Sequence, residues 1–332
     1  MSKRILKIQN ATISGWASAV GRHESEGPLG SCFDFCDNTD KFGADTWEKA
    51  ENAMQKKATE LLMQKKDLAV SDVGAVFAGD LQNQCVGSSY GLLDFDIPYF
   101  GLYGACSTAS EGMMLGAMCV SAGYFDRALA VTSSHYLAAE RQYRTPIEYG
   151  AQRSPTAQWT VTGAGAFCID KNGNAAITEA VAGIVVEKGI NDASNMGAAM
   201  APAAADTLLA YFSESGRLPS DFDAIVTGDL GYEGGTILCE LLLSEGLDIR
   251  EQYTDCGILI YDRKRQDMHA GGSGCGCSAV VMAGHFLNRV SSGNMKNMLF
   301  LGTGAMMSPS SIQQGMAIPA VAHLIRIEHR GN

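Results

Sequence analysis

The pattern of apolar and polar positions along the chain predicts the same run of elements twice. Residues 73–81 (VGAVFAGDL) and 222–230 (FDAIVTGDL) are short apolar runs ending in Gly-Asp-Leu, which is typical of a buried strand followed by a turn. A segment of helical periodicity precedes each run, at residues 46–66 and at residues 203–215. Two helix–strand units of one design indicate an internal duplication.

Two further pairs of segments follow in the same order. Residues 103–124 and 270–286 each open with a Gly-rich turn that carries Cys and Ser, and continue as a helix that is apolar almost all round. A helix with so little polar surface is buried on every side. Residues 127–134 and 297–304 then predict strands that end in a small polar turn. The order strand, turn, buried helix, strand thus occurs twice.

This duplication predicts an α/β fold in which two βαβ halves, residues 1–170 and 171–332, pack face to face. Neither half is thick enough to cover its own apolar helix, so both helices are expected between two sheets. Ligands of such sheets bind beyond the carboxyl ends of the strands. Six residues fall near these strand ends: Asp80, Cys106, Ser133, Asp229, Ser273 and Gly304.

Composition and charge narrow the class of function. With 46% hydrophobic and only 18% charged residues, the chain has enough apolar side chains for a large core. The net charge of −11 disfavours a nucleic-acid partner, because phosphate binding needs a basic surface. The N-terminus has no signal-peptide pattern, and no run of about 18 apolar residues occurs. We therefore expect an intracellular protein without a membrane span of its own.

The ten cysteines show no metal-binding spacing, so we expect free thiols in a reducing compartment and no metal site. Cys106 is the cysteine for which a functional role is expected. In GACST it begins a helix after a Gly-Ala turn, where the helix dipole and unpaired N–H groups favour a thiolate. A buried structural cysteine is the less favoured alternative. Cys275 and Cys277 in the matching turn of the second half are expected to be packing residues.

A cysteine nucleophile needs a base within hydrogen-bond reach, usually a histidine. His135 follows the turn at residues 132–134 and His269 precedes the turn at residues 270–274, but neither stands in a convincing catalytic motif. The residues alone therefore leave three possibilities. One is acyl transfer by Cys106 with an unorthodox histidine base, and the second is a pocket that only binds its ligand. The third is a structural scaffold whose pocket is empty and has no role.

Several dense motifs give the chain a family resemblance. They are GPLGS (27–31), AGDLQNQ (78–84), FGLYGACST (100–108), VTSSH (131–135), AERQYRTPIEYG (139–150), MGAAMAPAAADT (196–207), TGDL (227–230), DCGILIY (255–261) and AGGSGCGCSAVV (270–281). On these residues the chain resembles the thiolase and ketoacyl-synthase superfamily over almost its whole length. It resembles more closely the stage V sporulation protein AD family. The resemblance implies a thiolase fold, which is a five-layer αβαβα sandwich.

The resemblance also implies the fate of the catalytic residues. Cys106 matches the superfamily's nucleophile, whereas Gly228 stands where condensing enzymes have histidine and Ser273 where they have asparagine. Gly304 matches the strand end whose N–H helps to form the oxyanion hole. Since one catalytic group is worth about 10²–10⁴-fold in rate, two losses imply a protein that binds without condensing. The alternative is an acyl-CoA-dependent acyltransferase with Cys106 as nucleophile.

For the sporulation family, the resemblance implies that the former active-site cleft binds dipicolinate, either alone or as its calcium chelate. No other cofactor is expected. The protein would support uptake of dipicolinate into the developing spore, with membrane-embedded partners of the same operon. It would reach the spore inner membrane peripherally, through those partners, and form a homodimer. The residues expected to bind the ligand are Asp80, Cys106, Ser107, His135, Gly228, Asp229, Ser273 and Gly304.

Two points about this pocket stay open at the level of sequence. Asp80 and Asp229 would either face bound calcium or order their turns. Arg141, Arg144 and Arg153 would either supply a cation to the cleft or form a solvated face.

Overall fold

The computed structural model describes residues 3–143 and 153–331, in which ten main strands form two five-stranded units. The strands of the first unit are β2 (Thr12–Val20), β4 (Ala75–Gly79), β5 (Tyr99–Gly101), β6 (Ala128–Ser134) and β8 (Gly163–Asp170). Those of the second are β9 (Ala175–Val181), β10 (Ala224–Thr227), β11 (Tyr253–Asp255), β13 (Asn297–Ala305) and β14 (Ala320–His329). Their spatial orders, β5-β4-β6-β8-β2 and β11-β10-β13-β14-β9, correspond strand by strand.

Strand directions repeat as well. In each unit the first three strands of that order are parallel, the fourth runs antiparallel to them, and the fifth is antiparallel to the fourth and so runs in the direction of the first three. The units join at one corner, where β2 pairs with β9 through Thr12 and Ile13 only. Short strands β1 (Ile5–Lys7) and β3 (Phe35–Cys36) add to β9 and β2. A separate two-stranded sheet pairs β7 (Trp159–Thr160) with β12 (Gly272–Ser273).

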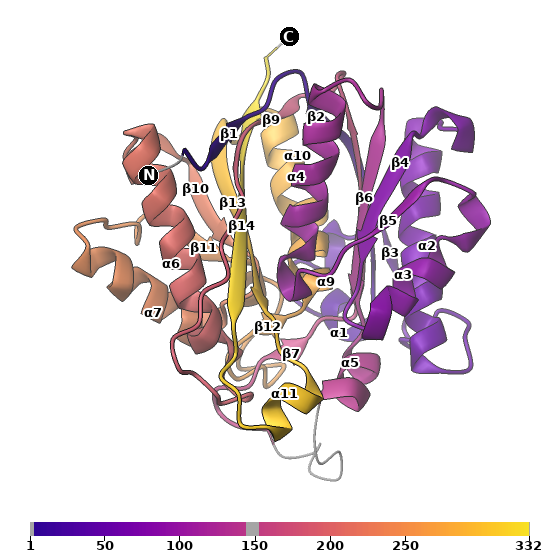
Figure 1. Cartoon of the computed structure of the whole chain (residues 1–332). Helices are drawn as coiled ribbons and strands as arrows, with labels where there is room; N and C mark the ends of the chain where they lie inside the picture. The colour runs from indigo at the N-terminus through magenta and orange to yellow at the C-terminus, as the bar shows by residue number, and fades with distance from the viewer. Residues whose placement is uncertain (1–2, 144–152, 332) are drawn as a thin grey trace.

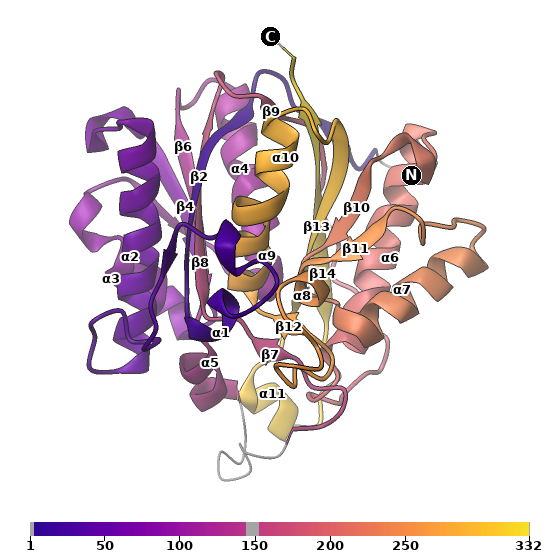
Figure 2. The same cartoon turned by 180° about the vertical axis from the view of Figure 1, so that it is seen from behind.

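The helices complete five layers, as Figures 1 and 2 show from opposite sides. The long helices are α2 (Trp47–Lys66), α4 (Thr108–Ser121), α6 (Met196–Ser215) and α7 (Gly231–Ser244). Shorter ones are α1 (Arg22–Ser25), α3 (Val86–Gly91), α5 (Tyr136–Tyr143), α8 (Cys256–Leu259), α9 (Cys275–Val281), α10 (Leu287–Ser291) and α11 (Pro309–Gln313). Helices α2 and α3 cover the outside of the first sheet, and α6 and α7 that of the second. Helices α4, α9 and α10 lie between the sheets, so the predicted α/β class with five layers is confirmed.

Small residues allow the helices of the central layer to pack closely against the neighbouring strands and against each other. A Cβ atom added to Gly116 of α4 would come within 2.7 Å of Ile169 Cδ1 on β8. A Cβ atom on Gly165 of β8 would come within 2.8 Å of the Ala279 Cβ of α9. Close backbone approach of this kind leaves no room for larger side chains. This close packing also fixes where α4 and α9 begin, and both of these helices begin beside the same strand ends.

The duplication is confirmed at the level of topology, whereas a division at residue 170 into separate domains stays a prediction. The antiparallel strands were not anticipated, because the sequence indicated only βαβ units. Helix α6 was also predicted too short, from residue 203 onward. It begins at Met196, with the Asn195 side chain accepting a hydrogen bond from the Ala198 N–H, and it continues through Pro202.

Candidate functional site

Cys106 lies in a tight 3-10 turn, Ala105–Ser107, that leads into α4. Ala105 has φ +49°, a left-handed conformation that a residue with a Cβ rarely adopts. Hydrogen bonds hold the turn: the Ser107 hydroxyl donates to the Gly104 carbonyl at 2.6 Å, and the Gly104 N–H donates to the Thr108 hydroxyl at 3.1 Å. The thiol is directed to the carboxyl ends of the strands, and Cys106 is 6% exposed.

The end of β13 packs directly against this turn. An added Cβ at Gly304 would lie 2.1 Å from the Gly104 carbonyl oxygen, so backbone meets backbone there. Gly304 therefore supports the turn from behind and is absent from the pocket lining. Gly228, at the end of β10, has more space, since its nearest neighbours would be 3.4 Å from an added Cβ.

These two glycines give a matched pair of substitutions. Gly304→Ala must displace the Cys106 turn, so we expect a loss of about 1–3 kcal/mol in the free energy of unfolding. Gly228→Ala meets only ordinary van der Waals contacts and should leave stability nearly unchanged. Urea denaturation of both variants measures the difference. Equal stability of the two would contradict the close packing of Gly304 on the turn.

Asp229 is the carboxyl side chain near Cys106. Its carboxylate accepts hydrogen bonds from the Gly274 N–H (2.9 Å), the Ser273 hydroxyl (3.2 Å) and the Thr303 hydroxyl (2.8 Å). The Cys106 thiol is near enough to this carboxyl for each group to influence the pKa of the other. Asp229 is 1% exposed, and burial raises the pKa of its carboxyl above the ordinary value.

This arrangement reverses the pKa expected for Cys106. Burial, followed by the neighbouring Asp229 charge and hydrogen bond, raises the pKa of the thiol well above its ordinary value, and the Gly274 N–H and Ser273 only partly oppose that. The prediction that the helix start favours a thiolate is therefore wrong in this context. A helix dipole is a weaker influence than burial of the thiol beside a carboxyl.

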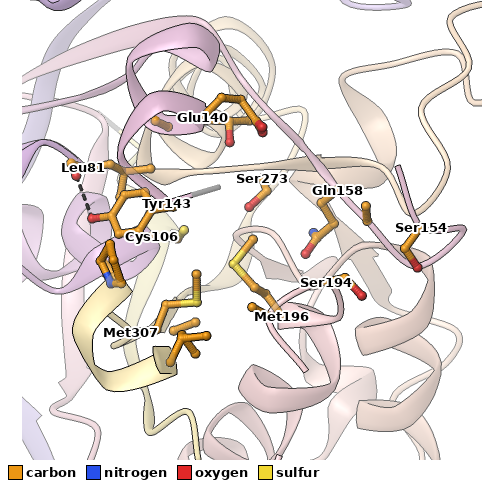
Figure 3. A pocket seen from close by; sticks show the side chains of 18 of the residues that line it. Leu81, Cys106, Glu140, Tyr143, Ser154, Gln158, Ser194, Met196, Ser273 and Met307 are labelled. Carbon is orange, nitrogen blue, oxygen red and sulfur yellow. Dashed lines mark hydrogen bonds between the residues drawn. The ribbon is translucent and has the colours of Figure 1, made fainter. Parts of the chain in front are cut away.

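A pocket of about 430 Å³ opens above Cys106 and Ser273 (Figure 3). Tyr103 and Tyr143 form one side, and the hydroxyl groups of these two tyrosines hydrogen-bond at 2.7 Å. Met196 and Met307 point into the cavity from the second half. The remaining lining residues are Leu81, Ala105, Ala139, Glu140, Ser154, Ala157, Gln158, Thr160, Ala193, Ser194, Ala305, Pro309, Ile312 and Gln313.

Of the predicted ligand-binding residues, only Cys106 and Ser273 line this pocket. Asp229 lies directly beneath it. Ser107 and Gly304 belong to the supporting turn, and Gly228 is buried between β13 and α9.

Asp80 and His135 are buried apart from the pocket lining. Asp80 accepts hydrogen bonds from the Gln82 N–H (2.8 Å) and from the N–H and hydroxyl of Ser88 (2.6 Å each), which is turn chemistry. Burial raises its pKa, and raises the pKa of neighbouring Glu51 to about 8. His135 Nε2 lies 2.8 Å from the Asp40 carbonyl, and burial lowers the pKa of the ring.

The second candidate base, His269, is engaged elsewhere. Its Nδ1 lies 2.8 Å from the Ser154 carbonyl and its Nε2 lies 3.3 Å from Asp267. Within residues 3–143 and 153–331, neither His269 nor His135 is among the hydrogen-bond partners of Cys106. No group of three or more His, Cys, Asp or Glu side chains suited to a metal occurs in those residues either.

The arginines were expected either to supply a cation to the cleft or to form a solvated face. Arg141 pairs with Glu48 at 3.1 Å on the surface, and Arg153 pairs with Asp267 at 2.8 Å while its guanidinium lies over Trp159. Arg144 lies outside the described residues. Neither Arg141 nor Arg153 lines the pocket.

Sequence reasoning missed much of the pocket wall. Glu140 and Tyr143 belong to the motif at residues 139–150, and Met196 opens the motif at residues 196–207, yet no role was assigned to them. Gln158 was also missed. It donates from Nε2 to the carbonyls of Asp229 (2.7 Å) and Gly272 (3.0 Å), and so ties the pocket wall to its floor.

Comparison with known proteins assigns the family. The family model of Stage V sporulation protein AD (SpoVAD) matches residues 2–328. The chain belongs to this family. Stage V sporulation protein AD of Bacillus subtilis (strain 168) is 41% identical over 320 residues, which cover 96% of this chain and 94% of that protein. The family resemblance inferred from the motifs is therefore confirmed.

Solved structures show that this SpoVAD family member has a thiolase fold. The 3-oxoacyl-[acyl-carrier-protein] synthase III of Aquifex aeolicus VF5 superposes with a TM-score of 0.59 at 9% identity, covering 96% of this chain and all of that one. A variant of OleA from Xanthomonas campestris gives 0.60 at 15% identity, covering 97% and 99% of the two chains. These likenesses establish the fold, and function has to be argued from the site.

Proposed function

We propose that this sporulation protein uses its thiolase-type pocket to bind dipicolinate without condensing acyl groups, and that binding supports uptake of dipicolinate into the developing spore. The observation that carries the proposal is Asp229. A condensing cysteine needs a partner that accepts its proton and stabilises the thiolate. Here burial and the neighbouring Asp229 carboxyl raise the pKa of the Cys106 thiol, which disfavours the thiolate instead. The dipicolinate part of the proposal follows from the family resemblance.

The shape of the pocket supports a small, flat ligand. A volume of about 430 Å³ lies within the range for small-molecule sites. The Tyr103 and Tyr143 rings and the Met196 and Met307 thioethers are suited to packing against an aromatic ring.

Charge supports the calcium chelate over the free dianion. Asp229 lies beneath the lining, and the lining residues that the structure describes include no lysine or arginine. A dianion placed there finds no cationic side chain in that lining, whereas a one-to-one chelate with calcium is neutral and needs none. Calcium would thus arrive with the ligand and not occupy a site of its own.

Calorimetry with intact-protein mass measurement tests the proposal. We expect saturable binding of dipicolinate, strengthened by equimolar calcium, and no acetyl adduct on Cys106 after incubation with acetyl-CoA. The competing function is acyl transfer by Cys106, which the presence of its thiol in the pocket favours. An adduct that forms and turns over, without dipicolinate binding, would establish that function instead.

A second copy of this chain is the proposed first partner. Strand β5 is the edge of its sheet, and its three residues are all exposed. Phe100 on this strand is 48% exposed, and Tyr90 (64%) and Leu93 (68%) of the preceding segment are exposed as well. An apolar sheet edge of this kind favours association.

We expect Phe100→Glu to shift the protein from dimer to monomer, because it places charge in the apolar edge. Tyr124→Glu, at a site that is 77% exposed outside this edge, is the control and should leave the dimer intact. Sedimentation velocity measures both. A Phe100→Glu variant that stays dimeric would place the interface elsewhere.

Contact with the spore inner membrane would then depend on membrane-embedded partners of the same operon. Among the described residues, none of the helices combines the length and the apolar character needed to cross a bilayer. The net charge of −11 also disfavours direct adsorption to anionic lipid.

A further inference from the structure

A groove runs along the outer side of the second half, between helix α7 and the edge strand β11. Its volume is about 390 Å³, and it shares no lining residue with the pocket above Cys106. Tyr253 of β11 and Ile258 of α8 form one wall. One face of α7 forms the other wall, at helical spacing, with Tyr232, Thr236, Cys239, Glu240 and Leu243. Figure 2 shows these elements on the side of the molecule opposite α2 and α3.

Apolar and aromatic side chains line most of this groove, although it is open to solvent. Leu243 is 44% exposed, and Tyr253 and Ile258 are half-buried. Helix α7 cannot move closer and cover them, because a Cβ atom added to Gly235 would already lie 2.6 Å from the Tyr253 hydroxyl oxygen. Strand β11 is also the edge of its sheet. An open apolar groove beside a sheet edge is typical of an interaction surface.

The cations beside the groove already have acidic partners. Arg250 pairs with Asp248 at 2.6 Å. Arg263 lies 4.1 Å from the centre of the Tyr232 ring and 3.8 Å from Glu233. Neither guanidinium therefore offers an unmatched positive charge to an anionic partner.

Three exposed glutamates at the groove are unmatched. Glu240 lines the groove, and Glu245 and Glu251 follow Leu243 and Arg250 within two residues along the chain. In the part of the chain that the structure describes, residues 3–143 and 153–331, none of these three glutamates is in an ion pair. An apolar groove with an acidic rim is complementary to an apolar segment that carries Lys or Arg.

We propose that this groove docks a Lys- and Arg-rich cytoplasmic loop of a membrane-embedded partner. The inference rests on the proposed dependence on such partners, and it names the surface that they use. Membrane proteins carry an excess of Lys and Arg in their cytoplasmic loops, which supplies the complementary charge. Apolar side chains of the loop would pack on Leu243, Tyr253 and Ile258.

A second copy of this chain fits the groove poorly. A two-fold contact brings the same patch of both copies together. Glu240, Glu245 and Glu251 would then face their own equivalents, and like charges repel each other. The proposed contact between copies uses β5, which is the corresponding edge of the first half, so the two edges would serve different partners.

Leu243→Lys and Leu241→Lys form a matched pair of variants. Both place a lysine on α7 and change the net charge equally, but Leu241 is 37% exposed outside the groove. The test is flotation of the purified full chain with washed membrane vesicles from sporulating cells, prepared with the cytoplasmic face outward. We expect Leu241→Lys to float within about twofold of the wild type. Leu243→Lys should bind at least about tenfold more weakly, because it places a cation against the docked cations.

Three treatments identify what occupies the groove. Trypsin cleaves after Lys and Arg, so vesicles treated with trypsin and then with its inhibitor should no longer bind the wild type. Raising NaCl from about 0.05 M to about 0.5 M should weaken binding to intact vesicles, because salt screens exposed charges. Protein-free vesicles of phosphatidylglycerol should not bind the wild type. Binding to them through Leu243 would assign the surface to lipid and overturn the proposal.

The outcomes separate this inference from the proposed function. Flotation of Leu243→Lys at the wild-type level would overturn the groove as the docking surface. A wild-type protein that does not float would overturn it together with the dependence on membrane-embedded partners. Calorimetry with dipicolinate should give wild-type affinity for both variants, since neither residue lines the pocket above Cys106. Loss of dipicolinate binding in all three proteins would refute the ligand and leave the docking result standing.

Discussion

Met307→Trp should abolish dipicolinate binding while leaving the protein folded. The Met307 side chain points into the pocket beside Met196, and the residue is only half-buried at the end of β13 (Figure 3). An indole there fills the space above Cys106 that the ring of the ligand needs. We expect at least about a 100-fold loss of affinity, equivalent to about 2.7 kcal/mol, in calorimetric titrations.

Met316→Trp is the control for this substitution. Met316 is 54% exposed and does not line the pocket, yet it lies only a short distance along the chain. Its affinity for dipicolinate and its melting temperature should match those of the wild type. Undiminished binding by a folded Met307→Trp variant would mean that the ligand occupies another site.

Glu179→Ala should produce the largest loss of stability. The Glu179 side chain on β9 is 3% exposed, and it accepts hydrogen bonds from Arg217 Nη1 (2.9 Å) and the Tyr211 hydroxyl (2.7 Å). Arg326 lies 3.5 Å away, and Lys7 also pairs with this carboxylate. Removing this anion leaves Lys7 and Arg217 without their partner and leaves Arg326 paired with Glu328 alone, at a cost of about 3–5 kcal/mol in the free energy of unfolding.

The pH dependence gives this prediction a second test. Lys7, Tyr211, Arg217 and Arg326 together outweigh burial and lower the pKa of Glu179 from 4.5 to about 2. Because the folded-state pKa is the lower one, the stabilisation is fully present above the unfolded value near 4.5. The difference in free energy of unfolding between wild type and Glu179→Ala should therefore shrink as pH falls from 4.5 towards 2.

Asp248→Ala tests whether a lowered pKa alone, without burial, makes a carboxylate important for stability. Asp248 also has a pKa lowered to about 2, through its hydrogen bonds to Arg250, but this pair is on the surface. Surface ion pairs contribute little, so urea denaturation should barely distinguish this variant from wild type. If the Glu179→Ala variant is as stable as Asp248→Ala, the ion pairs and hydrogen bonds of buried Glu179 do not have the structural role described.

The strongly patterned parts of the fold were predictable from the sequence. The helix predicted at residues 46–66 is α2, and the strands predicted at residues 127–134 and 297–304 are β6 and β13, within a residue at either end. The start of α6 was not predictable in the same way. Its first two turns are small apolar residues with a proline at position 202, so they show neither a polar face nor an uninterrupted helical signal.

The position of Cys106 was predictable, but its chemistry was not. A helix start can be found from local sequence, whereas the carboxyl that lies near the sulfur comes from a turn more than a hundred residues further along the chain. The family resemblance placed Gly228 at the position of the catalytic histidine, yet in the turn after β10 the next residue, Asp229, is the one that lies near the thiol. A shift of one residue at a strand end changes which side chain faces the site.

The direction of β13 and β14 has a practical consequence for locating the protein in cells. Strand β13 runs from Asn297 to the pocket wall at Ala305, and β14 returns antiparallel to His329 beside Lys296. Nine residues of strand span about 30 Å, so His329 lies at the end of the sandwich opposite α11 (Figure 1). A fluorescent protein attached at that end would leave the pocket entrance unobstructed.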